Sequence, residues 1–220
     1  VLFRSNRKEM CINMTITIKT DVVLEEEIKK SKFICQLKRV TSEEEAREFI
    51  TSIKKKHHKA SHNVSAFVIG DHQEIQRSSD DGEPSGTAGV PMLEILKKRE
   101  LIDVVAVVTR YFGGIKLGAG GLIRAYAGSV NHAIDSVGLV EIVEQTQLDI
   151  VMGYHLFDSV SRYLSIEALP IADTEFTDQV TVTCFCDTVQ MALIIAGLTD
   201  QFNGQLQLTK GDKKLVEVLL

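Results

Sequence analysis

The stretch 103-DVVAVVTRYF-112, followed at once by 113-GGIKLGAGG-121, decides how this chain is expected to fold. Its first part is rich in β-branched residues and begins as a continuous apolar run, which predicts a strand buried at the centre of a sheet. Five glycines within nine residues then lead into a helix, expected from about Leu122 to Val137 and closed by Gly138. The rest of the domain is expected to pack around this strand, turn and helix.

The segments upstream predict further strands and helices of an α+β domain. Residues 21–40 read as two strands, and residues 63–70 and 73–78 as a hairpin. Thr41–Glu44 has the spacing of a capping box and introduces a helix with apolar residues at helical intervals. Pro91 is expected to start a short helix over 91–100.

The composition changes near residues 141–145. From Met14 to Glu141 there are 18 basic and 18 acidic residues, whereas from Thr146 to Asp212 there are two basic and nine acidic ones. The expected order in the second part is β-α-β-β-α-β, typical of a ferredoxin-like domain, with strands over 146–152, 169–176, 179–186 and 205–210 and helices over 155–167 and 188–202. We therefore predict two α+β domains, 14–143 and 145–220, and an N-terminal extension over 1–13 outside the fold.

The whole chain has the composition of an ordinary globular protein, with 220 residues, 44% hydrophobic residues and a net charge of −5. No apolar run of about 18 residues predicts a membrane span, and the N-terminus lacks the pattern of a secretory signal. The four cysteines are scattered and favour small hydrophobic roles in a reduced, cytoplasmic protein over a metal site. We expect neither a cofactor nor a bound metal. The cysteines are Cys11, Cys35, Cys184 and Cys186.

The glycine-rich turn and the helix after it predict an anion site. Glycines allow a ligand to approach the backbone, and the free N–H groups of a helix start attract phosphate. Three cations accompany them, which favours this interpretation slightly over glycines that serve only a tight turn and close helix packing. The order of residues matches neither a P-loop nor a full dinucleotide fingerprint. The expected site consists of Arg110, Lys116, Gly118, Gly120, Gly121 and Arg124.

A second unusual stretch, 78-SSDDGEPSGTAGVP-91, carries Asp80, Asp81 and Glu83. These carboxylates could bind a divalent cation, act as acid–base groups or simply form turns. The interpretation we favour is that they brace the other loop by pairing with Arg110 or Arg124. Thr87 is a candidate cap for the helix that follows.

The run 54-KKKHHK-59 ends the first expected helix with Lys54, Lys55, Lys56 and Lys59. A nucleic-acid contact and a solvated helix end are about equally good explanations of such a run. Few aromatic residues accompany these cations, so the expected readout is of the phosphate backbone rather than of bases. No GxSxG elbow or cysteine–histidine pattern points to a nucleophile, and no catalytic residue is assigned.

Taken together, SSDDGEPSGTAGVPML and VVAVVTRYFGGIKLGAGGLIRAYAGSVN strongly resemble the signature of the YigZ/IMPACT family, in particular its bacterial YigZ/YvyE type. The resemblance implies an N-terminal domain of the ribosomal-protein-S5-domain-2-like type and a C-terminal ferredoxin-like domain similar to those late in elongation factor G. It also implies a cytoplasmic protein connected with nucleic acid or the translation apparatus. Eukaryotic members regulate a starvation response that acts on translation initiation, through a partner-binding region that this chain is expected to lack.

Three functions follow as hypotheses. The first is a regulator of translation that binds RNA or the ribosome, with the cations and glycines above as its phosphate site. The second is an enzyme acting on a phosphorylated small molecule or nucleotide, which requires a closed pocket between the two glycine-rich stretches. The third is a protein–protein module whose acidic C-terminal domain contacts a partner. We expect a binding protein rather than an enzyme, without a membrane partner.

Overall fold

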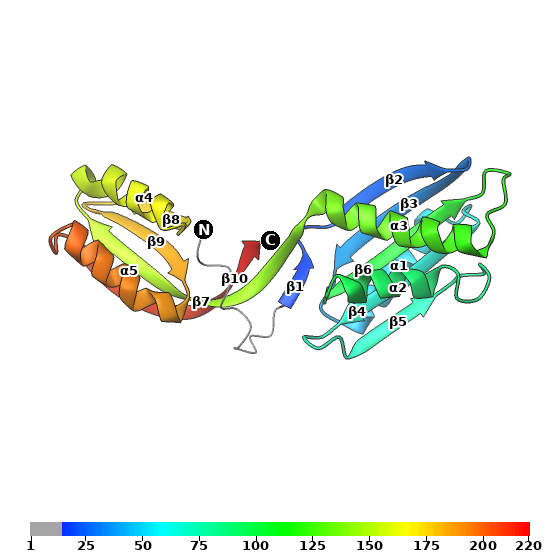
Figure 1. The fold of residues 1–220 in the computed structure, drawn as a ribbon, viewed down its shortest axis with the longest axis horizontal. Coiled ribbons are helices and arrows are strands. Elements are labelled where there is room, and N and C mark those ends of the chain that lie inside the picture. The colour runs from blue at the N-terminus through cyan, green and yellow to red at the C-terminus, as the bar shows by residue number, and fades with distance from the viewer. Residues whose placement is uncertain (1–14) are drawn as a thin grey trace. The chain divides into compact units, whose positions relative to one another are not determined.

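The computed structural model describes residues 15–220, and the expected extension over 1–13 lies outside them. The chain divides into two compact units, unit 1 up to Ile142 together with Val218–Leu220, and unit 2, Val143–Glu217. The boundary falls within strand β7 (Leu139–Met152), which pairs with β1 (Thr15–Ile18) at its start and with β9 further along. Each unit combines a sheet with helices (Figure 1), which confirms the predicted α+β class.

Unit 1 is built on a five-stranded sheet in the order β2-β3-β6-β4-β5, with all neighbours antiparallel. The central strand is β6, as the apolar run at 103–112 predicts. The strands are β2 (Val22–Ile28), β3 (Ser31–Arg39), β4 (His62–Ile69), β5 (Ile75–Ser79) and β6 (Val104–Tyr111).

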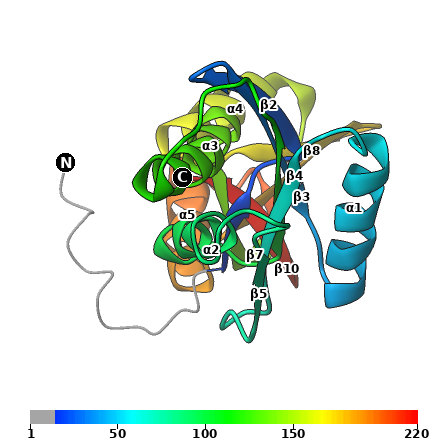
Figure 2. The same ribbon diagram turned by 90° about the vertical axis from the view of Figure 1, so that its right-hand side faces the viewer.

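Helices cover both faces of this sheet. Helices α2 (Gly89–Lys98) and α3 (Ala119–Val137) pack on one face, and α1 (Glu43–Lys56) lies on the other (Figure 2). Alternate residues of β6 therefore enter two different cores. Val104, Ala106 and Val108 pack with α2 and α3, whereas Val105 and Val107 pack with α1. A strand covered on both faces has no polar side, which explains its continuous apolar run.

The helix starts differ from the predicted ones by a few residues. The capping box lies one residue later than predicted: Ser42 Oγ accepts the Glu45 N–H at 3.2 Å, and Glu45 Oε2 accepts the Thr41 N–H at 2.7 Å. Helix α2 begins at Gly89 rather than at Pro91. Helix α3 begins at Ala119, three residues before Leu122, and ends at Val137, followed by the predicted cap Gly138 with a φ of 78°.

Unit 2 has the strand order β10-β7-β9-β8, in which the last strand lies beside the first, as in a ferredoxin-like domain. Inward residues of β7 and β9 alternate along each strand and pack under both helices. This confirms the predicted ferredoxin-like order. The remaining elements are a short 3-10 helix (Tyr154–Leu156), α4 (Phe157–Ile166), β8 (Ile171–Phe176), β9 (Val180–Cys186), α5 (Thr188–Gln201) and β10 (Gln207–Leu219).

Three of the cysteines lie in the cores of the two units. Cys35, Cys184 and Cys186 are free, buried thiols, and Cys11 lies outside the described residues. Burial, with a smaller contribution from Cys186 and Asp149, raises the pKa of Cys184 to about 12. At neutral pH such a thiol stays protonated and packs as a small hydrophobic group. Within residues 15–220, no helix has both the length and the apolar character that a membrane span requires.

Candidate nucleic-acid interface

One end of the unit 1 sheet gathers both glycine-rich stretches and the basic end of α1. Ile28 pairs with Ser31 across the β2–β3 turn, and β3 begins beside the end of β6, where Lys32 lies opposite Tyr111. Strand β4 also begins there, since His62 pairs with Arg110. His57, just after α1, lies 3.0 Å from the Tyr111 hydroxyl through its Nδ1. Segments far apart in the sequence are therefore neighbours at this end.

A buried ion pair joins the two glycine-rich stretches. Arg110 Nη1 donates to Glu83 Oε1 at 2.6 Å, and these side chains are only 6% and 4% exposed. The hydroxyl of Tyr126, on α3, donates to the same carboxylate oxygen at 2.8 Å. His62 Nε2 lies 3.8 Å from the other oxygen of Glu83. The Glu83 carboxylate thus connects its own loop, residues 78–91, with β6, β4 and α3.

The Arg110 guanidinium packs near two aromatic rings. Its central carbon is 5.5 Å from the ring centre of Phe33 and 5.6 Å from that of Phe112. Such stacking on aromatic faces favours a guanidinium over an ammonium group. Arg110 was expected to contact phosphate, but its guanidinium is buried and paired inside the protein. The geometry favours a bracing role for Arg110 over direct contact with an anion.

Asp81 forms a second brace, to the end of α1. Its Oδ1 lies 2.6 Å from Lys54 Nζ, and its Oδ2 accepts the backbone N–H of Asn63 at 2.6 Å. Its backbone has a φ of 47°, and its carbonyl oxygen lies 2.9 Å from His62 Nδ1. Although partial burial opposes ionisation, the hydrogen bonds from Lys54 and Asn63 lower the pKa of Asp81. Lys54 is therefore neutralised within the protein, unlike the lysines that follow it.

Asp80 was expected to brace a cation, and the structure gives it a different role. It accepts backbone N–H groups from Gly86 at 2.8 Å, Ala88 at 3.1 Å and Gly89 at 2.7 Å. These bonds lower the pKa of Asp80 against the opposing effect of burial. Asp80 thereby caps the start of α2 from a position eight or nine residues earlier in the chain. The hydroxyl of Thr87, the expected cap, instead donates to the carbonyl oxygen of Pro84. A distant cap cannot be recognised from capping-box spacing.

The glycines after β6 fall into two groups. A side chain at Gly113 would lie 1.6 Å from the carbonyl oxygen of Lys30, and Gly114 has a φ of 90°. Packing and backbone conformation therefore require these two. Gly118, Gly120 and Gly121 have no positive φ, and a Cβ there would meet nothing closer than 3.4 Å. Neither a tight turn nor close packing accounts for this second group, which lies at the start of α3.

Several exposed cations surround this end of the sheet. Among the cations predicted for the anion site and the basic run, Lys54 and Arg110 are paired inside the protein. The other predicted cations form no ion pair with any residue from 15 to 220. The β2–β3 turn adds two lysines that the sequence reading missed, with φ values of 47° and 63°. We call the resulting set the basic end: Lys29, Lys30, Lys55, Lys56, Lys59, Lys116 and Arg124.

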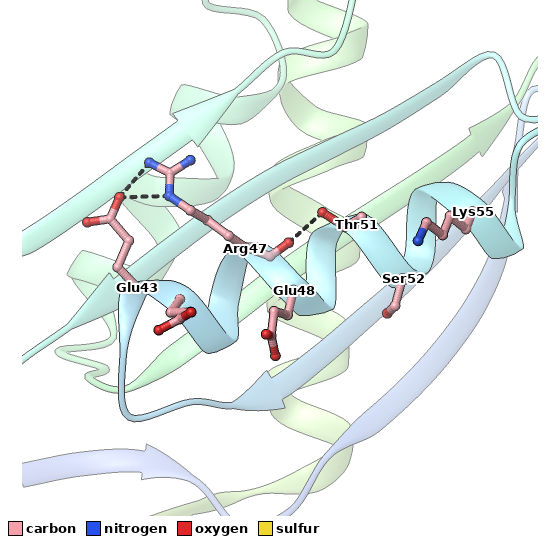
Figure 3. A pocket seen from close by; sticks show the side chains of 7 residues that line it. Glu43, Arg47, Glu48, Thr51, Ser52 and Lys55 are labelled. Atoms are coloured by element: carbon pink, nitrogen blue, oxygen red, sulfur yellow. Dashed lines mark hydrogen bonds and ion pairs between the residues drawn. The ribbon is translucent and has the colours of Figure 1, made fainter.

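Two shallow hollows of unit 1 lie away from the glycine-rich stretches. One, of about 640 Å³, runs along the outer face of α1, where Arg47 pairs with Glu43 and Lys55 lies at the far end (Figure 3). The other, of about 480 Å³, is lined by residues that include Gly70 and Asp103, at the opposite end of the sheet. Neither hollow offers the enclosed site between the two stretches that the enzyme hypothesis requires. Within residues 15–220, no three or more His, Cys, Asp and Glu side chains are grouped to hold a metal.

Comparison of the chain with known proteins identifies its family. The model of the Impact N-terminal domain matches residues 29–134, and a domain of unknown function (DUF1949) matches residues 150–205. The chain is 44% identical over 190 residues to the IMPACT family member YvyE of Bacillus subtilis, covering 86% of this chain and 88% of YvyE. It is 36% identical over 189 residues to YigZ of Escherichia coli, covering 85% and 93%.

A solved crystal structure of a hypothetical protein matches 89% of this chain and 96% of its own, at 35% identity and a TM-score of 0.56. A structure of the two-domain translational regulator Yih1 matches 59% of this chain at 25% identity, but its TM-score of 0.35 is too low to compare the two folds. Identity to YvyE and YigZ extends over both units of the chain. The chain belongs to the IMPACT family.

Proposed function

We propose that this chain is a cytoplasmic regulator of translation that binds RNA or the ribosome through the phosphate groups of RNA. The observation that carries the proposal is the basic end, where seven exposed cations from three segments lie around one end of the unit 1 sheet. Two carboxylates that would repel phosphate there are occupied, since Asp81 is paired with Lys54 and Glu83 with Arg110. Clustered cations release counterions on binding nucleic acid, which supplies affinity without base contacts.

The start of α3 supplies the second part of the proposed phosphate site. The amide groups of a helix start carry partial positive charge and point toward an incoming anion. Gly118 and Gly120 leave this backbone open, and Lys116 and Arg124 flank it. Because no packing constraint explains these glycines, close approach of a ligand to the backbone is the reason we assign to them.

Family membership supports the connection with translation. The resemblance to this family implies such a connection, because its eukaryotic members regulate a starvation response that acts on translation initiation, and we therefore look for the bound RNA in the translation apparatus. The Impact N-terminal domain matches residues 29–134, within unit 1, so we place the contact there and leave the eukaryotic partner aside.

Fluorescence anisotropy with a labelled single-stranded RNA, alongside co-sedimentation with ribosomes, tests the proposal. Affinity should fall steeply between about 50 and 200 mM salt. Lys59→Glu and Arg124→Glu should each weaken binding by about tenfold and reduce the salt slope by about 1. Lys98→Glu is the matched control, because Lys98 is an exposed lysine of α2 at the opposite end of the sheet. Absence of binding at low salt, or equal effects of all three reversals, would contradict the proposal.

A protein partner of unit 2 is a second candidate, favoured by the outer face of α5. This face exposes an apolar stripe at helical spacing, Val189, Ala192, Leu193 and Ala196, and the helix has no basic residue. If the stripe contacts a ribosomal protein, Leu193→Asp should reduce co-sedimentation with ribosomes but leave binding of free RNA unchanged. If Leu193→Asp weakens both co-sedimentation and binding of free RNA, or changes neither, the protein contact at this stripe is contradicted.

A further inference from the structure

Phe112 is an exposed aromatic side chain among the cations of the basic end. It is 48% exposed, directly after β6 and four residues before Lys116. Ile115 and Ile123, on either side of the start of α3, are each 41% exposed. From the sequence we expected few aromatic residues for base stacking; the structure shows that one of them, Phe112, is exposed at this position.

Contacts with the protein restrict the position of the Phe112 ring. The Arg110 guanidinium packs 5.6 Å from its centre, and that group is itself fixed by its hydrogen bond to Glu83 and by contact with Phe33. The Phe112 backbone N–H also donates to Ser61 Oγ at 3.2 Å. A ring fixed in this way loses little conformational freedom when a ligand stacks on it, so the entropy cost of binding is small.

No other aromatic ring from residues 15–220 packs on Phe112. The exposed aromatic residues of unit 2 differ in this respect, since Tyr154 and Phe176 stack on each other with ring centres 6.3 Å apart. Phe112 therefore presents an aromatic surface to solvent beside cations, which is how proteins that bind single-stranded nucleic acid combine base stacking with phosphate contacts.

We propose that Phe112 is a stacking platform for an unpaired base, so that the basic end binds single-stranded rather than duplex RNA. This inference rests on the proposed RNA binding and adds the class of RNA. A base paired within a duplex has both faces covered by its neighbours, whereas an unpaired base can lie flat on the ring. Lys116 and Arg124 would then hold the phosphates beside that nucleotide, and Ile115 and Ile123 would contact the apolar C–H surface of its sugar or of a neighbouring base.

The chain has no tryptophan, so Phe112→Trp introduces a single fluorescent reporter at the proposed platform. A short oligo(A) RNA should quench this tryptophan as it binds, and an RNA duplex should not. Phe112→Leu should weaken oligo(A) binding by about 5- to 150-fold, because stacking contributes about 1–3 kcal/mol per base. Duplex binding should change less than twofold. Leucine still covers Arg110, so a matching melting temperature would show that the loss comes from stacking and not from unfolding.

The alternative role for Phe112 is to cover the buried ion pair without touching a ligand. If Phe112→Leu binds oligo(A) as tightly as the wild type, or if it weakens duplex binding equally, the stacking inference is overturned. The proposed function survives that result provided that Lys116→Glu and Arg124→Glu still weaken binding. If neither oligo(A) nor duplex binds at low salt, both proposals fail together.

Discussion

Arg110 donates a hydrogen bond to Glu83 at 2.6 Å inside unit 1, with both side chains almost completely buried. The Glu83 oxygen that accepts it also accepts the Tyr126 hydroxyl, whose pKa is raised by burial and by Glu83 itself. A buried pair contributes little to net stability compared with apolar residues of the same shape, but it is costly to break. Its role is to fix the 78–91 loop, β6 and α3 in one arrangement, with Phe112 and the cations on the outside.

Removal of one partner of this pair should destabilise unit 1 strongly. Glu83→Gln leaves the Arg110 charge buried without a carboxylate, so we expect a loss of about 3–5 kcal/mol in the free energy of unfolding. Tyr126→Phe removes one hydrogen bond and should cost about 1–2 kcal/mol. Urea unfolding measures both, and Glu94→Gln, on the exposed side of α2, is the control. A loss below about 1 kcal/mol for Glu83→Gln would show that the pair is more hydrated than the structure indicates.

Much of the fold could be predicted because local patterns determine it. The β-branched run at 103–112 identified the central strand, and the β-α-β-β-α-β order identified the ferredoxin-like unit. The pairing of β1 with the start of β7 could not be predicted, since Ile18 and its partner Leu139 are 121 positions apart and neither segment carries a local signal for the other. Contacts of this kind depend on tertiary packing rather than on periodicity.

The candidate site could be predicted only in part. Its residue types were evident, and so was the idea that carboxylates brace an arginine. Whether Asp80, Asp81 or Glu83 meets that arginine depends on the path of the loop, and Asp80 instead caps a helix. Lys29 and Lys30 look like ordinary turn residues in the sequence, and only the strand order brings them beside Tyr111.

Asp80→Asn should weaken unit 1 in a pH-dependent way. Because hydrogen bonds from the start of α2 hold the pKa of Asp80 below its ordinary value, the carboxylate stabilises the fold at pH values above about 4. This contribution is lost as the pH falls through the lowered pKa. We expect Asp80→Asn to cost about 1–2 kcal/mol at neutral pH and to reduce the acid-dependent loss of stability. Urea unfolding at a series of pH values measures both effects, and a mutant whose curve runs parallel to the wild type would contradict the assigned pKa.

Gly120→Ala should separate binding from stability. In a helix, alanine is favoured over glycine by about 0.8–1 kcal/mol, and the added methyl group meets only Arg124, at 3.8 Å. The mutant should therefore be as stable as the wild type or more stable. If a phosphate approaches this backbone, RNA affinity should nevertheless fall several-fold. Gly128→Ala, in the middle of the same helix with open space around it, should likewise be as stable as the wild type or more stable, with unchanged affinity. Equal affinities for both mutants would exclude the start of α3 from the interface.

Lys30→Gly tests whether the β2–β3 turn keeps a strained lysine for binding. Both turn residues have positive φ, a conformation in which glycine is favoured and a lysine costs energy. The substitution should stabilise unit 1 by about 0.5–1 kcal/mol while it lowers RNA affinity, since a cation of the basic end is lost. Glu100→Gly is the matched control, because Glu100 also has a positive φ, at 56°, after α2 at the opposite end of the sheet. It should show a similar stability gain without loss of affinity. If Lys30→Gly gains stability and binds RNA as well as the wild type, the turn lies outside the interface, which is then confined to the cations at and just after the end of α1 and those around the start of α3.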